Sequence, residues 1–379
     1  MKKTLLAAAL VAGFAGAAQA ETSVTLYGII DTGIGYNQVK GDQAPGGKAT
    51  RFGMINGVQS GSRWGMKGSE DLGSGLRAVF QLEGGFDSST GAMAQGGSGF
   101  NRIFGRQATV GLAGDSWGQL DLGRQTNIAS KYLGGVIDPF NNGFGQANLG
   151  MSFTSANTLR LDNMVLYQTP NFSGFQFGLG YAFNANGSQT WKISGQDDNN
   201  TRQVTTGLRY ANGPISAALT YDRFDNNAQS GSAVSEWNIG AAYNFEIVKL
   251  GLGFGQTRNG LFATQGPGAG VPGSGSYGAT SASLVKLDGL KVNSYLVSLT
   301  APVGNGAILA SWQMADPGST ANDYTLSGAS AKQQSYSLGY TYNLSKRTNL
   351  YAYGSYANHV YFEDDLKSTA VGVGIRHMF

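Results

Sequence analysis

Side chains alternate along much of this chain, so that every second residue has a similar character. Residues 371–379 read VGVGIRHMF, which puts Val371 and Phe379 on one face of an extended strand and Arg376 on the other, because strand side chains repeat every two residues. Residues 175–183 show the same pattern, with aromatic and leucine side chains alternating with glutamine, glycine and alanine. Such alternation predicts β-strands with one apolar face and one small or polar face.

Sixteen alternating segments can be counted, and the connections between them are alternately short and long. The strands are predicted at residues 23–36, 51–68, 75–86, 102–114, 118–125, 159–169, 175–184, 202–211, 214–224, 235–245, 248–259, 289–300, 306–315, 333–343, 348–357 and 368–379. The short connections, rich in turn-forming residues, include 69–75, 115–117, 170–174, 212–214 and 344–348. The long connections, polar or glycine-rich, lie near 37–50, 87–101, 126–158, 185–201, 225–234, 260–288, 316–332 and 358–367. An even number of strands brings both chain ends to the same side.

Composition supports a membrane barrel over a soluble fold. The chain has 59 glycines, eight prolines and a mean hydropathy of −0.18, a value that hides barrel strands because their two faces cancel in the average. No segment after the first twenty residues approaches twenty apolar residues, so the chain can cross a membrane only as a closed barrel, where every backbone polar group is paired. We predict an all-β fold: a 16-stranded antiparallel transmembrane β-barrel with short periplasmic turns and long extracellular loops. A soluble β-sandwich is the alternative.

The first twenty residues have the features of a secretory signal peptide. Lys2 and Lys3 precede an apolar run that ends in the cleavage motif Ala18-Gln-Ala20. A transmembrane helix is the alternative, but the run is short for a hydrocarbon core of about 30 Å. We expect residues 1–20 to direct export through the Sec pathway and to be removed. Residues 21–379 then form one barrel domain, since no linker or composition shift divides them.

Charge and cysteine content argue against several classes of function. The chain has 26 basic and 23 acidic residues, a net charge of +3, and removal of Lys2 and Lys3 leaves 24 against 23, which offers no basic surface for nucleic acid. Cysteine is absent and the histidines are His359 and His377, so neither a metal-ligand cluster nor a catalytic triad can be recognised. We predict no cofactor, no metal and no enzymatic activity; a barrel enzyme and an adhesin are the less favoured alternatives.

Nine short motifs follow one another along the chain: VTLYGIID (24–31), SRWGMKGSEDL (62–72), AVFQLE (78–83), RQATVGL (106–112), LGRQ (122–125), DPF (138–140), RxxNxVxY (160–167), YxYNLSKRT (340–348) and RHMF (376–379). In this order they resemble the general diffusion porins of the Gram-negative outer membrane, in the branch typified by neisserial and related porins. The resemblance covers the whole mature chain.

The resemblance carries expectations about assembly and surroundings. It implies a homotrimer in the outer membrane of a Gram-negative bacterium, with a water-filled pore in each protomer. It also implies that the third extracellular loop, here roughly residues 126–158, folds inward and narrows the pore. Outer-membrane lipid and lipopolysaccharide are the expected neighbours. The closing strand with Phe379 is the expected signal for the barrel assembly machinery.

Candidates for the pore lining come from alternation and from the resemblance. Alternation places Arg63, Lys67, Arg77 and Glu83 on the water-facing side of their strands. In the family, a ladder of basic wall residues faces acids on the inward loop, and the resemblance implies these roles for Arg63, Arg77, Arg106, Arg124 and Arg160, with Asp138 as the loop acid. In a regular strand, Arg106 and Arg124 would lie on the same face as the apolar residues of their strands. Each therefore needs a bulge or a strand end to face inward. The alternative is a strand-end arginine bound to a carbonyl or a lipid phosphate.

Charge in the third loop predicts the ion preference. Residues 126–158 contain one acid, Asp138, and one base, Lys131, so the loop itself is neutral, and with the wall arginines the constriction carries more positive than negative charge. Because charge at a narrow section sorts ions, we expect passive diffusion of ions and small hydrophilic solutes with weak to moderate anion preference. An inward-facing acid placed elsewhere would reverse that sign. A substrate-specific channel is the alternative, although the inward positions hold mainly Gly, Gln, Ser, Thr and Arg rather than a run of aromatics.

Overall fold

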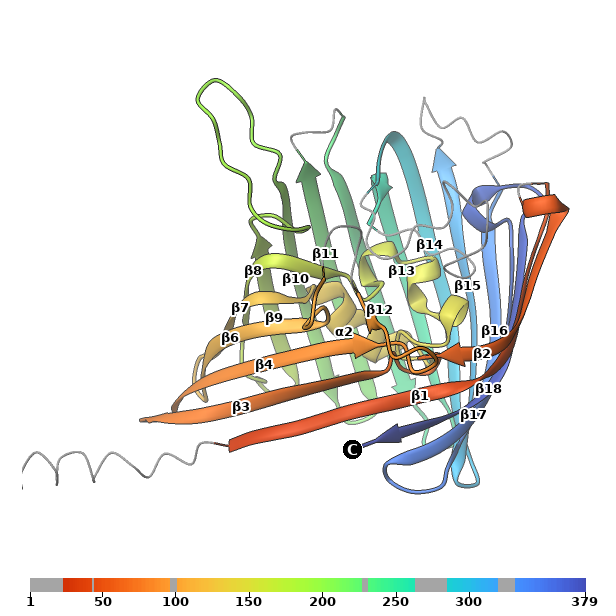
Figure 1. Ribbon diagram of the computed structural model, residues 1–379, viewed down its shortest axis with the longest axis horizontal. Coiled ribbons are helices and arrows are strands. Elements are labelled where there is room, and N and C mark those ends of the chain that lie inside the picture. The colour runs from red at the N-terminus through yellow and green to blue at the C-terminus, as the bar shows by residue number, and fades with distance from the viewer. Residues whose placement is uncertain (1–22, 43, 96–100, 227–230, 263–284, 320–330) are drawn as a thin grey trace, which may run out of the picture.

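The computed structural model describes residues 23–42, 44–95, 101–226, 231–262, 285–319 and 331–379. Its strands form a closed antiparallel barrel (Figure 1), and the predicted number of sixteen barrel strands is confirmed. The expected signal peptide, residues 1–20, lies outside the described residues. Within those residues, no helix combines the length and the apolar character needed to cross a bilayer.

The barrel strands in chain order are β1 (Ser23–Lys40), β2 (Lys48–Asn56), β3 (Arg63–Gly73), β4 (Leu76–Phe86), β6 (Gln107–Gly114), β7 (Gly118–Thr126), β8 (Arg160–Gln168), β9 (Phe175–Ala182), β10 (Thr201–Asn212), β11 (Ile215–Asn226), β12 (Val234–Asn244), β13 (Lys249–Leu261), β14 (Val285–Val303), β15 (Gly306–Ser319), β16 (Gln333–Asn343), β17 (Thr348–Asn358) and β18 (Lys367–Met378). β2 and β3 are two halves of one barrel strand, and β5 (Met93–Ala94) is a short addition beside the end of β4. The connections contain α2 (Ile128–Ile137) and the 3₁₀ helices η1 (Pro45–Gly47), η2 (Gly145–Ala147), η3 (Leu149–Met151), η4 (Thr154–Ala156) and η5 (Val360–Phe362).

The two ends of the described chain meet where the barrel closes. β1 pairs with β18 along twelve positions, with Asp31 opposite Arg376. The backbones of Gly28 and Phe379 exchange two hydrogen bonds of 3.1 Å each. The ring of Phe379 lies in the space that a side chain at residue 28 would occupy, so glycine is needed there. The terminal aromatic residue is therefore part of the closing seam.

The second barrel strand differs from the sequence prediction. One continuous strand is predicted over 51–68, but β2 ends at Asn56, β3 begins at Arg63, and residues 57–62 leave the sheet between them. β1 bridges this break, because one part of it pairs with β2 and the other with β3. The insertion has an even number of residues and keeps the alternation in phase on both sides, which is why the pattern does not reveal it.

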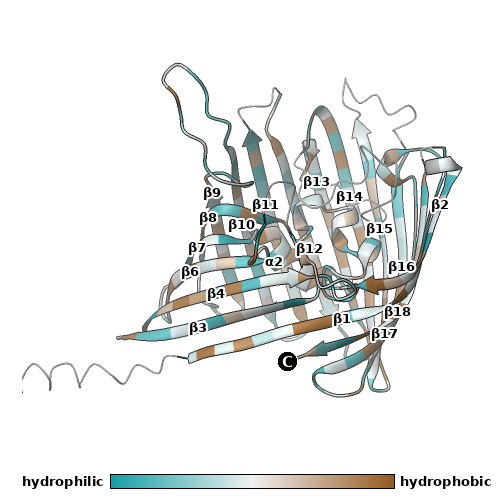
Figure 2. Cartoon of the chain, in the orientation of Figure 1, coloured by the Kyte–Doolittle hydropathy of each residue, from teal (hydrophilic) through white to brown (hydrophobic). Residues whose placement is uncertain are grey.

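Hydrophobic and hydrophilic residues alternate along strands such as β1 (Figure 2), and exposure shows that this alternation separates an outer from an inner face, as predicted. On β9 the side chains of Phe175, Phe177 and Leu179 are 48%, 40% and 47% exposed on the outer face. Gly178 and Gly180 alternate with these residues on the inner face, where a Cβ at Gly178 would meet Ile128 of α2. The outer face thus presents apolar side chains to the membrane, and the inner face leaves room for structure inside the barrel.

That internal structure is the connection between β7 and β8, residues 127–159, which we call loop 3. It contains α2 and the helices η2, η3 and η4, and it lies inside the barrel (Figure 1). The largest buried apolar cluster joins loop 3 to the wall, with Ile128, Leu133 and Phe153 from the loop. The predicted inward fold of the third loop is therefore confirmed, although the sequence did not predict its helix.

Candidate functional site: the pore lining

Glycines on the inner wall seat α2 against the barrel. A Cβ atom at Gly240 would stand 2.7 Å from Cγ2 of Ile137, and one at Gly253 would stand 2.5 Å from Cδ1 of the same residue. A Cβ at Gly207 would stand 2.8 Å from Cγ2 of Ile128. Any larger residue would push the helix toward the lumen. These strand glycines therefore set how far loop 3 projects into the pore.

A buried carboxylate fastens the last part of loop 3 to the wall. Glu236 on β12 is 1% exposed and accepts hydrogen bonds from Oγ1 of Thr154 at 2.5 Å and from N and Oγ of Ser155 at 3.1 and 2.8 Å. The side chains of Thr257 and Asn238 donate to it at 2.8 and 3.0 Å. A buried carboxylate with this many donors is a strong tether, because hydrogen bonds to a charged group are stronger than neutral ones.

The first part of loop 3 is held by a second buried carboxylate. Asn127 caps α2 by accepting a hydrogen bond from Ser130 N, and its Nδ2 donates to Asp222 on β11 at 2.8 Å. The backbone N–H of Ile128 donates to Oγ1 of Thr205 on β10 at 2.9 Å. Both ends of loop 3 are thus fixed to the same side of the barrel, and the inner acids Asp222 and Glu236 are engaged there rather than in open lumen.

The tip of loop 3 reaches the opposite side of the barrel. Nε2 of Gln146 donates to the carbonyl of Ser355 at 2.8 Å, and Oγ of Ser368 donates to Oε1 of Gln146 at 2.6 Å. The backbone N–H of Phe144 donates to the carbonyl of Val58, in the segment that interrupts the second strand. Loop 3 therefore runs along the inner wall from β7 to β18, where it meets residues 57–62. The open part of the barrel, which we call the passage, lies between loop 3 and the wall formed by β3, β4 and β6–β8.

Residues 57–62 also position two inward-facing arginines, Arg63 on β3 and Arg376 on β18. Asp31, fully buried, accepts the backbone N–H of Ser60 at 2.6 Å and so holds the segment in place. The carbonyl of Gly61 accepts Nε of Arg63 at 2.8 Å. Oγ of Ser60 accepts Nη1 of Arg376 at 3.2 Å. The break in the second strand thus frees the backbone carbonyl of Gly61, which a regular strand would use within the sheet, and supplies the hydroxyl of Ser60 as a second acceptor.

Arg63 and Arg106 converge on Glu83. Oε1 of Glu83 lies 2.6 Å from Nε of Arg106 and 3.9 Å from Nη1 of Arg63, while Oε2 accepts the hydroxyl of Tyr27 at 3.0 Å. Arg106 immediately precedes β6, so it is at a strand end and is not bound by the strand's parity. Arg106 can therefore face inward from a strand end, as the sequence analysis required. Three predicted pore residues, Arg63, Glu83 and Arg106, lie together.

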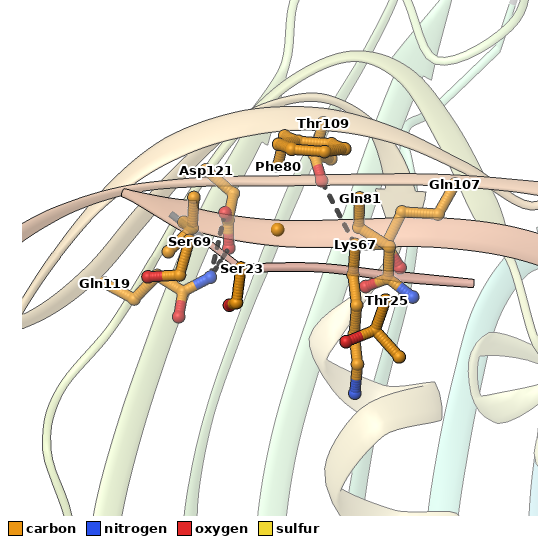
Figure 3. A pocket seen from close by; sticks show the side chains of 12 residues that line it. Ser23, Thr25, Lys67, Ser69, Phe80, Gln81, Gln107, Thr109, Gln119 and Asp121 are labelled. Carbon is orange, nitrogen blue, oxygen red and sulfur yellow. Dashed lines mark hydrogen bonds between the residues drawn. The ribbon is translucent and has the colours of Figure 1, made fainter. Parts of the chain in front are cut away.

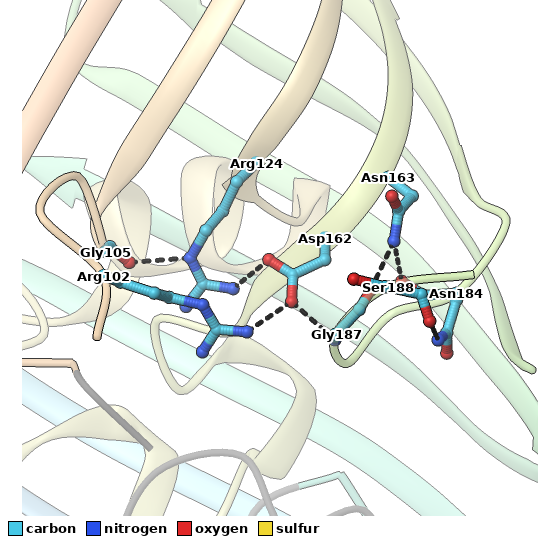
Figure 4. A network of polar contacts seen from close by, with 8 residues as sticks. All are labelled: Arg102, Gly105, Arg124, Asp162, Asn163, Asn184, Gly187 and Ser188. Atoms are coloured by element: carbon cyan, nitrogen blue, oxygen red, sulfur yellow. Dashed lines mark hydrogen bonds and ion pairs between the residues drawn. The ribbon is translucent and has the colours of Figure 1, made fainter. Parts of the chain in front are cut away.

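Arg124 and Arg102 converge on a second acid, Asp162 (Figure 4). Nη1 of Arg124 lies 2.6 Å from Oδ1 of Asp162, and Nη2 of Arg102 lies 2.6 Å from Oδ2. Nε of Arg124 donates to the carbonyl of Gly105 at 2.8 Å. A β-bulge between Gly123 and residue 125 in the pairing of β7 with β8 allows this orientation, as the parity argument required.

Arg160 stands at the first position of β8, close enough to Arg63, Arg106 and Arg124 for electrostatic interaction. Its Nη1 donates to the carbonyl of Thr158 at 3.3 Å, and within the described residues it has no ion pair. Its charge is repelled by these three arginines and only partly offset by Glu83, so it adds to the positive potential of the passage.

The cluster carries an excess of positive charge. It contains the five arginines Arg63, Arg102, Arg106, Arg124 and Arg160. Its acids are Glu83 and Asp162. The sum is five positive charges minus two negative charges, or +3. We call this group of seven residues the arginine cluster.

Two sequence candidates lie apart from the arginine cluster. Arg77 pairs with Asp115 at 2.9 Å, near the turn between β6 and β7, and the two side chains are 41% and 74% exposed. Asp138 is at the C-terminal end of α2, where its carboxylate accepts the backbone N–H groups of Phe140 at 2.9 Å and Asn142 at 2.8 Å. Burial nevertheless raises the pKa of Asp138 to about 6. In the structure this side chain organises loop 3.

Lys131 is the loop's own cation. It extends from α2, and its Nζ donates to Oε1 of Gln125 at 3.2 Å. Burial lowers the pKa of Lys131 to about 8, and the nearby carboxylate of Asp121 only partly opposes this shift. The loop therefore carries a positive charge at neutral pH and loses it in mildly alkaline solution.

A polar pocket of about 260 Å³ lies along the same wall, toward its short-turn end (Figure 3). Thr25, Lys67, Gln81 and Thr109 line it from neighbouring strands, and Nε2 of Gln119 donates to the carboxylate of Asp121 there. Hydroxyl and amide groups of this kind keep the wall wetted. They offer small solutes hydrogen bonds without selecting one solute.

Sequence reasoning missed Arg102, Asp162, Asp222 and Glu236. Parity could have found the last of these, because Glu236 alternates in phase with other inner positions of β12. No comparable signal exists for Arg102, which lies in the connection before β6 and is placed by its ion pair with Asp162. The three missed acids, Asp162, Asp222 and Glu236, affect the charge balance of the lumen. Each of them accepts hydrogen bonds from neighbouring side chains.

A closed antiparallel barrel with apolar side chains outside, a loop folded inside and a charged, polar passage is the architecture of a membrane channel. Comparisons with known proteins agree. Residues 7–360 match the family model described as Gram-negative porin, and the chain belongs to this family. It is thus an outer-membrane porin of a Gram-negative bacterium, a transport protein rather than an enzyme, as the sequence predicted.

Individual relatives place the chain more closely. It is 56% identical over 398 residues to an outer membrane porin protein of Bordetella pertussis, with both chains fully covered. It is 32% identical over 214 residues to the major outer membrane protein P.IB of Neisseria meningitidis serogroup B, which covers 56% of each chain. Among solved structures, the anion-selective porin from Comamonas acidovorans superposes with a TM-score of 0.71 at 30% identity, covering 95% of this chain and all of that one. The resemblance inferred from the motifs is confirmed.

Proposed function

We propose that this porin is a general diffusion channel with a preference for anions, and that the arginine cluster is its selectivity element. The observation that carries the proposal is the net charge of +3 on one wall of the passage, opposite a loop that contributes Lys131 and no lumen-facing carboxylate among its described side chains. Low-dielectric walls concentrate the field of such charges across a narrow opening. Anions are attracted into the passage and cations are repelled.

The similarity to a porin named as anion-selective supports the same direction. It does so at 30% identity over nearly the whole chain. We assign the narrowest part of the passage, the constriction, to Arg63, Arg106, Arg124 and Arg160 with Glu83. Arg77 and Asp138 have no part in this assignment, because one is exposed beside a turn and the other is used within loop 3.

We also propose that the protein works as a homotrimer, each protomer with its own pore, and that the seam with Phe379 is presented to the barrel assembly machinery. Single-channel recording in a planar bilayer tests the channel and the trimer together. The expected result is ohmic conductance that appears in groups of three equal steps. Single, unequal steps would contradict the trimer, and no conductance from folded, inserted protein would contradict the channel.

A substrate-specific channel is the remaining candidate from the same architecture. Saturable transport would require aromatic or paired polar groups along the lumen, whereas the described pocket on the arginine wall is lined mainly by short hydroxyl and amide side chains. Liposome swelling with uncharged sugars of increasing size separates the two candidates. General diffusion predicts rates that fall smoothly with size; strong uptake of one sugar above smaller ones would favour specificity.

A further inference from the structure

One carboxylate, that of Asp162, contacts three separate segments of the chain (Figure 4). Its Oδ1 lies 2.6 Å from Nη1 of Arg124 on β7, and its Oδ2 lies 2.6 Å from Nη2 of Arg102 in the connection before β6. Oδ2 also accepts the backbone N–H of Gly187 at 2.7 Å. Gly187 lies in the connection between β9 and β10, residues 183–200, which we call loop 4. Two arginines of the cluster and the start of loop 4 therefore meet at one buried residue.

The next residue, Asn163, holds the same part of loop 4. Its Nδ2 donates to the carbonyl of Asn184 at 2.9 Å and to the carbonyl of Gly187 at 2.7 Å. Its own carbonyl accepts the backbone N–H of Phe183 at 3.1 Å. None of these contacts involves an arginine. Loop 4 is therefore fastened to Asp162 through a charged group and to Asn163 through neutral hydrogen bonds, and the two kinds of contact can be removed separately.

A β-bulge on β8 gives these two neighbours different partners. In the pairing of β7 with β8, Arg124 alone stands opposite Asp162 and Asn163. Asn163 has a φ of 49°, in the left-handed region that asparagine and glycine adopt most readily. Bulges of this kind re-aim side chains next to functional sites. Here the carboxylate turns to the arginines, while the amide of the following residue turns to loop 4 (Figure 4).

The two arginines that share Asp162 need its negative charge to stay together. Arg102 and Arg124 interact with one another as like charges, and Arg160 adds a further positive charge beside Arg124. Like charges this close repel one another. A neutral residue in place of Asp162 would therefore favour positions in which Arg102 and Arg124 move apart into wider, better hydrated space.

We propose that Asp162 is a positioning residue for the ion preference of the channel, and that Asp162 and Asn163 together couple loop 4 to the constriction. Asp162 keeps Arg102 and Arg124 in the passage, and its contact with Gly187 makes their position depend on where loop 4 is held. Loop 4 extends beyond the strand ends on the long-loop side of the barrel (Figure 1), so a contact made outside the barrel reaches the arginine cluster by this route. The coupling rests on the proposed anion preference. The wild-type protein alone decides that preference, whereas each variant relative to wild type decides the coupling, so the two can fail separately.

Asp162→Asn separates positioning from simple charge, because the two predict opposite results. With every arginine in place, the arginine cluster would keep five positive charges and one negative charge, and its net charge would rise from +3 to +4. That change would raise the ratio of chloride to potassium permeability by about fivefold. If Arg102 and Arg124 leave the passage, three positive charges and one negative charge remain, and we expect the ratio to fall by about fivefold. Zero-current potentials in planar bilayers give the ratio, and an unchanged or raised value would overturn the positioning role.

Asp121→Asn is the matched control, because it makes the same change in net charge without releasing an arginine. Asp121 is a buried acid of β7 whose carboxylate accepts Nε2 of Gln119 at 2.9 Å. Among the described residues it has no ion pair with an arginine. Its permeability ratio should not fall below that of wild type. A fall equal to that of Asp162→Asn would overturn the positioning role.

Asn163→Gly tests the coupling to loop 4 without changing any charge. Glycine readily adopts the left-handed backbone of this position, so the bulge is kept while two side-chain hydrogen bonds to loop 4 are lost. We expect the permeability ratio to fall by about twofold, as for the loss of about half a unit charge from the passage. Asn199→Gly, the same substitution at an exposed position of loop 4, should behave as wild type does. The shift in electrophoretic mobility on heating checks the folding of each variant, and a wild-type ratio from folded Asn163→Gly would overturn the coupling.

Discussion

Reversing the charge at Arg160 should reduce the anion preference of the channel while leaving its folding largely unchanged. Arg160 has no ion pair among the described residues and one long hydrogen bond to Thr158, so its replacement by glutamate disturbs few contacts. It nevertheless removes a positive charge from beside three other arginines and adds a negative one. The net charge of the arginine cluster falls from +3 to +1.

The expected magnitude follows from the charge and its distance. A unit charge about 5 Å from a permeating ion contributes roughly 0.8 kcal/mol in water, and about 0.5 kcal/mol after screening at 0.1 M salt. This energy acts with opposite signs on anions and cations, so one unit changes their permeability ratio by about fivefold. The reversal changes the charge by two units, and we expect the ratio of chloride to potassium permeability to fall by about thirtyfold.

Arg77→Glu is the matched control, because it makes the same change in net charge at an exposed position beside the short turns. Its permeability ratio should change by less than about twofold, since an exposed charge is screened by water and salt. Both ratios are obtained from zero-current potentials in planar bilayers under a potassium chloride gradient. Equal shifts in the two variants, or no shift in Arg160→Glu, would refute the assignment of selectivity to the arginine cluster.

Further predictions concern loop 3. Because the pKa of Lys131 is about 8, its positive charge is present below that pH and lost above it, so anion preference should decline between about pH 6.5 and 9.5, and Lys131→Met should remove this pH dependence. Glu236→Ala removes the acceptor of five hydrogen bonds and should loosen loop 3 by a few kcal/mol, seen as a noisier and larger single-channel current than in Glu236→Gln. Gly240→Val should move α2 toward the lumen and lower the conductance, whereas unchanged current would show that Ile137 can yield.

The fold was largely predictable because its main signal is local. Period-two alternation, short turns and long loops are set by neighbouring residues, and they gave the strand number and the inner and outer faces on β9. The break at residues 57–62 was not predictable in this way. Its cause is the set of acceptors and donors that Asp31 and loop 3 supply, and Asp31 is adjacent to it only in the folded barrel.

The candidate site was predicted in part for the same reason. Arg63 and Glu83 face the passage as alternation requires, while Arg106 and Arg124 do so through a strand end and a bulge that no sequence pattern located. The role of Asp138 depends on backbone N–H groups of its own loop, which become donors only when α2 ends at this residue. Ion pairs between distant segments, such as that of Arg102 with Asp162, decide the charge balance and are a property of the tertiary structure.

The zero-current potential of the wild-type protein across a tenfold potassium chloride gradient shows directly whether the arginine cluster makes the passage prefer anions. A passage governed by the arginine cluster lets chloride move down its gradient faster than potassium, so the dilute side should become negative. A positive dilute side would show that carboxylates govern the passage, and it would contradict the anion preference while leaving the barrel and its family unchanged.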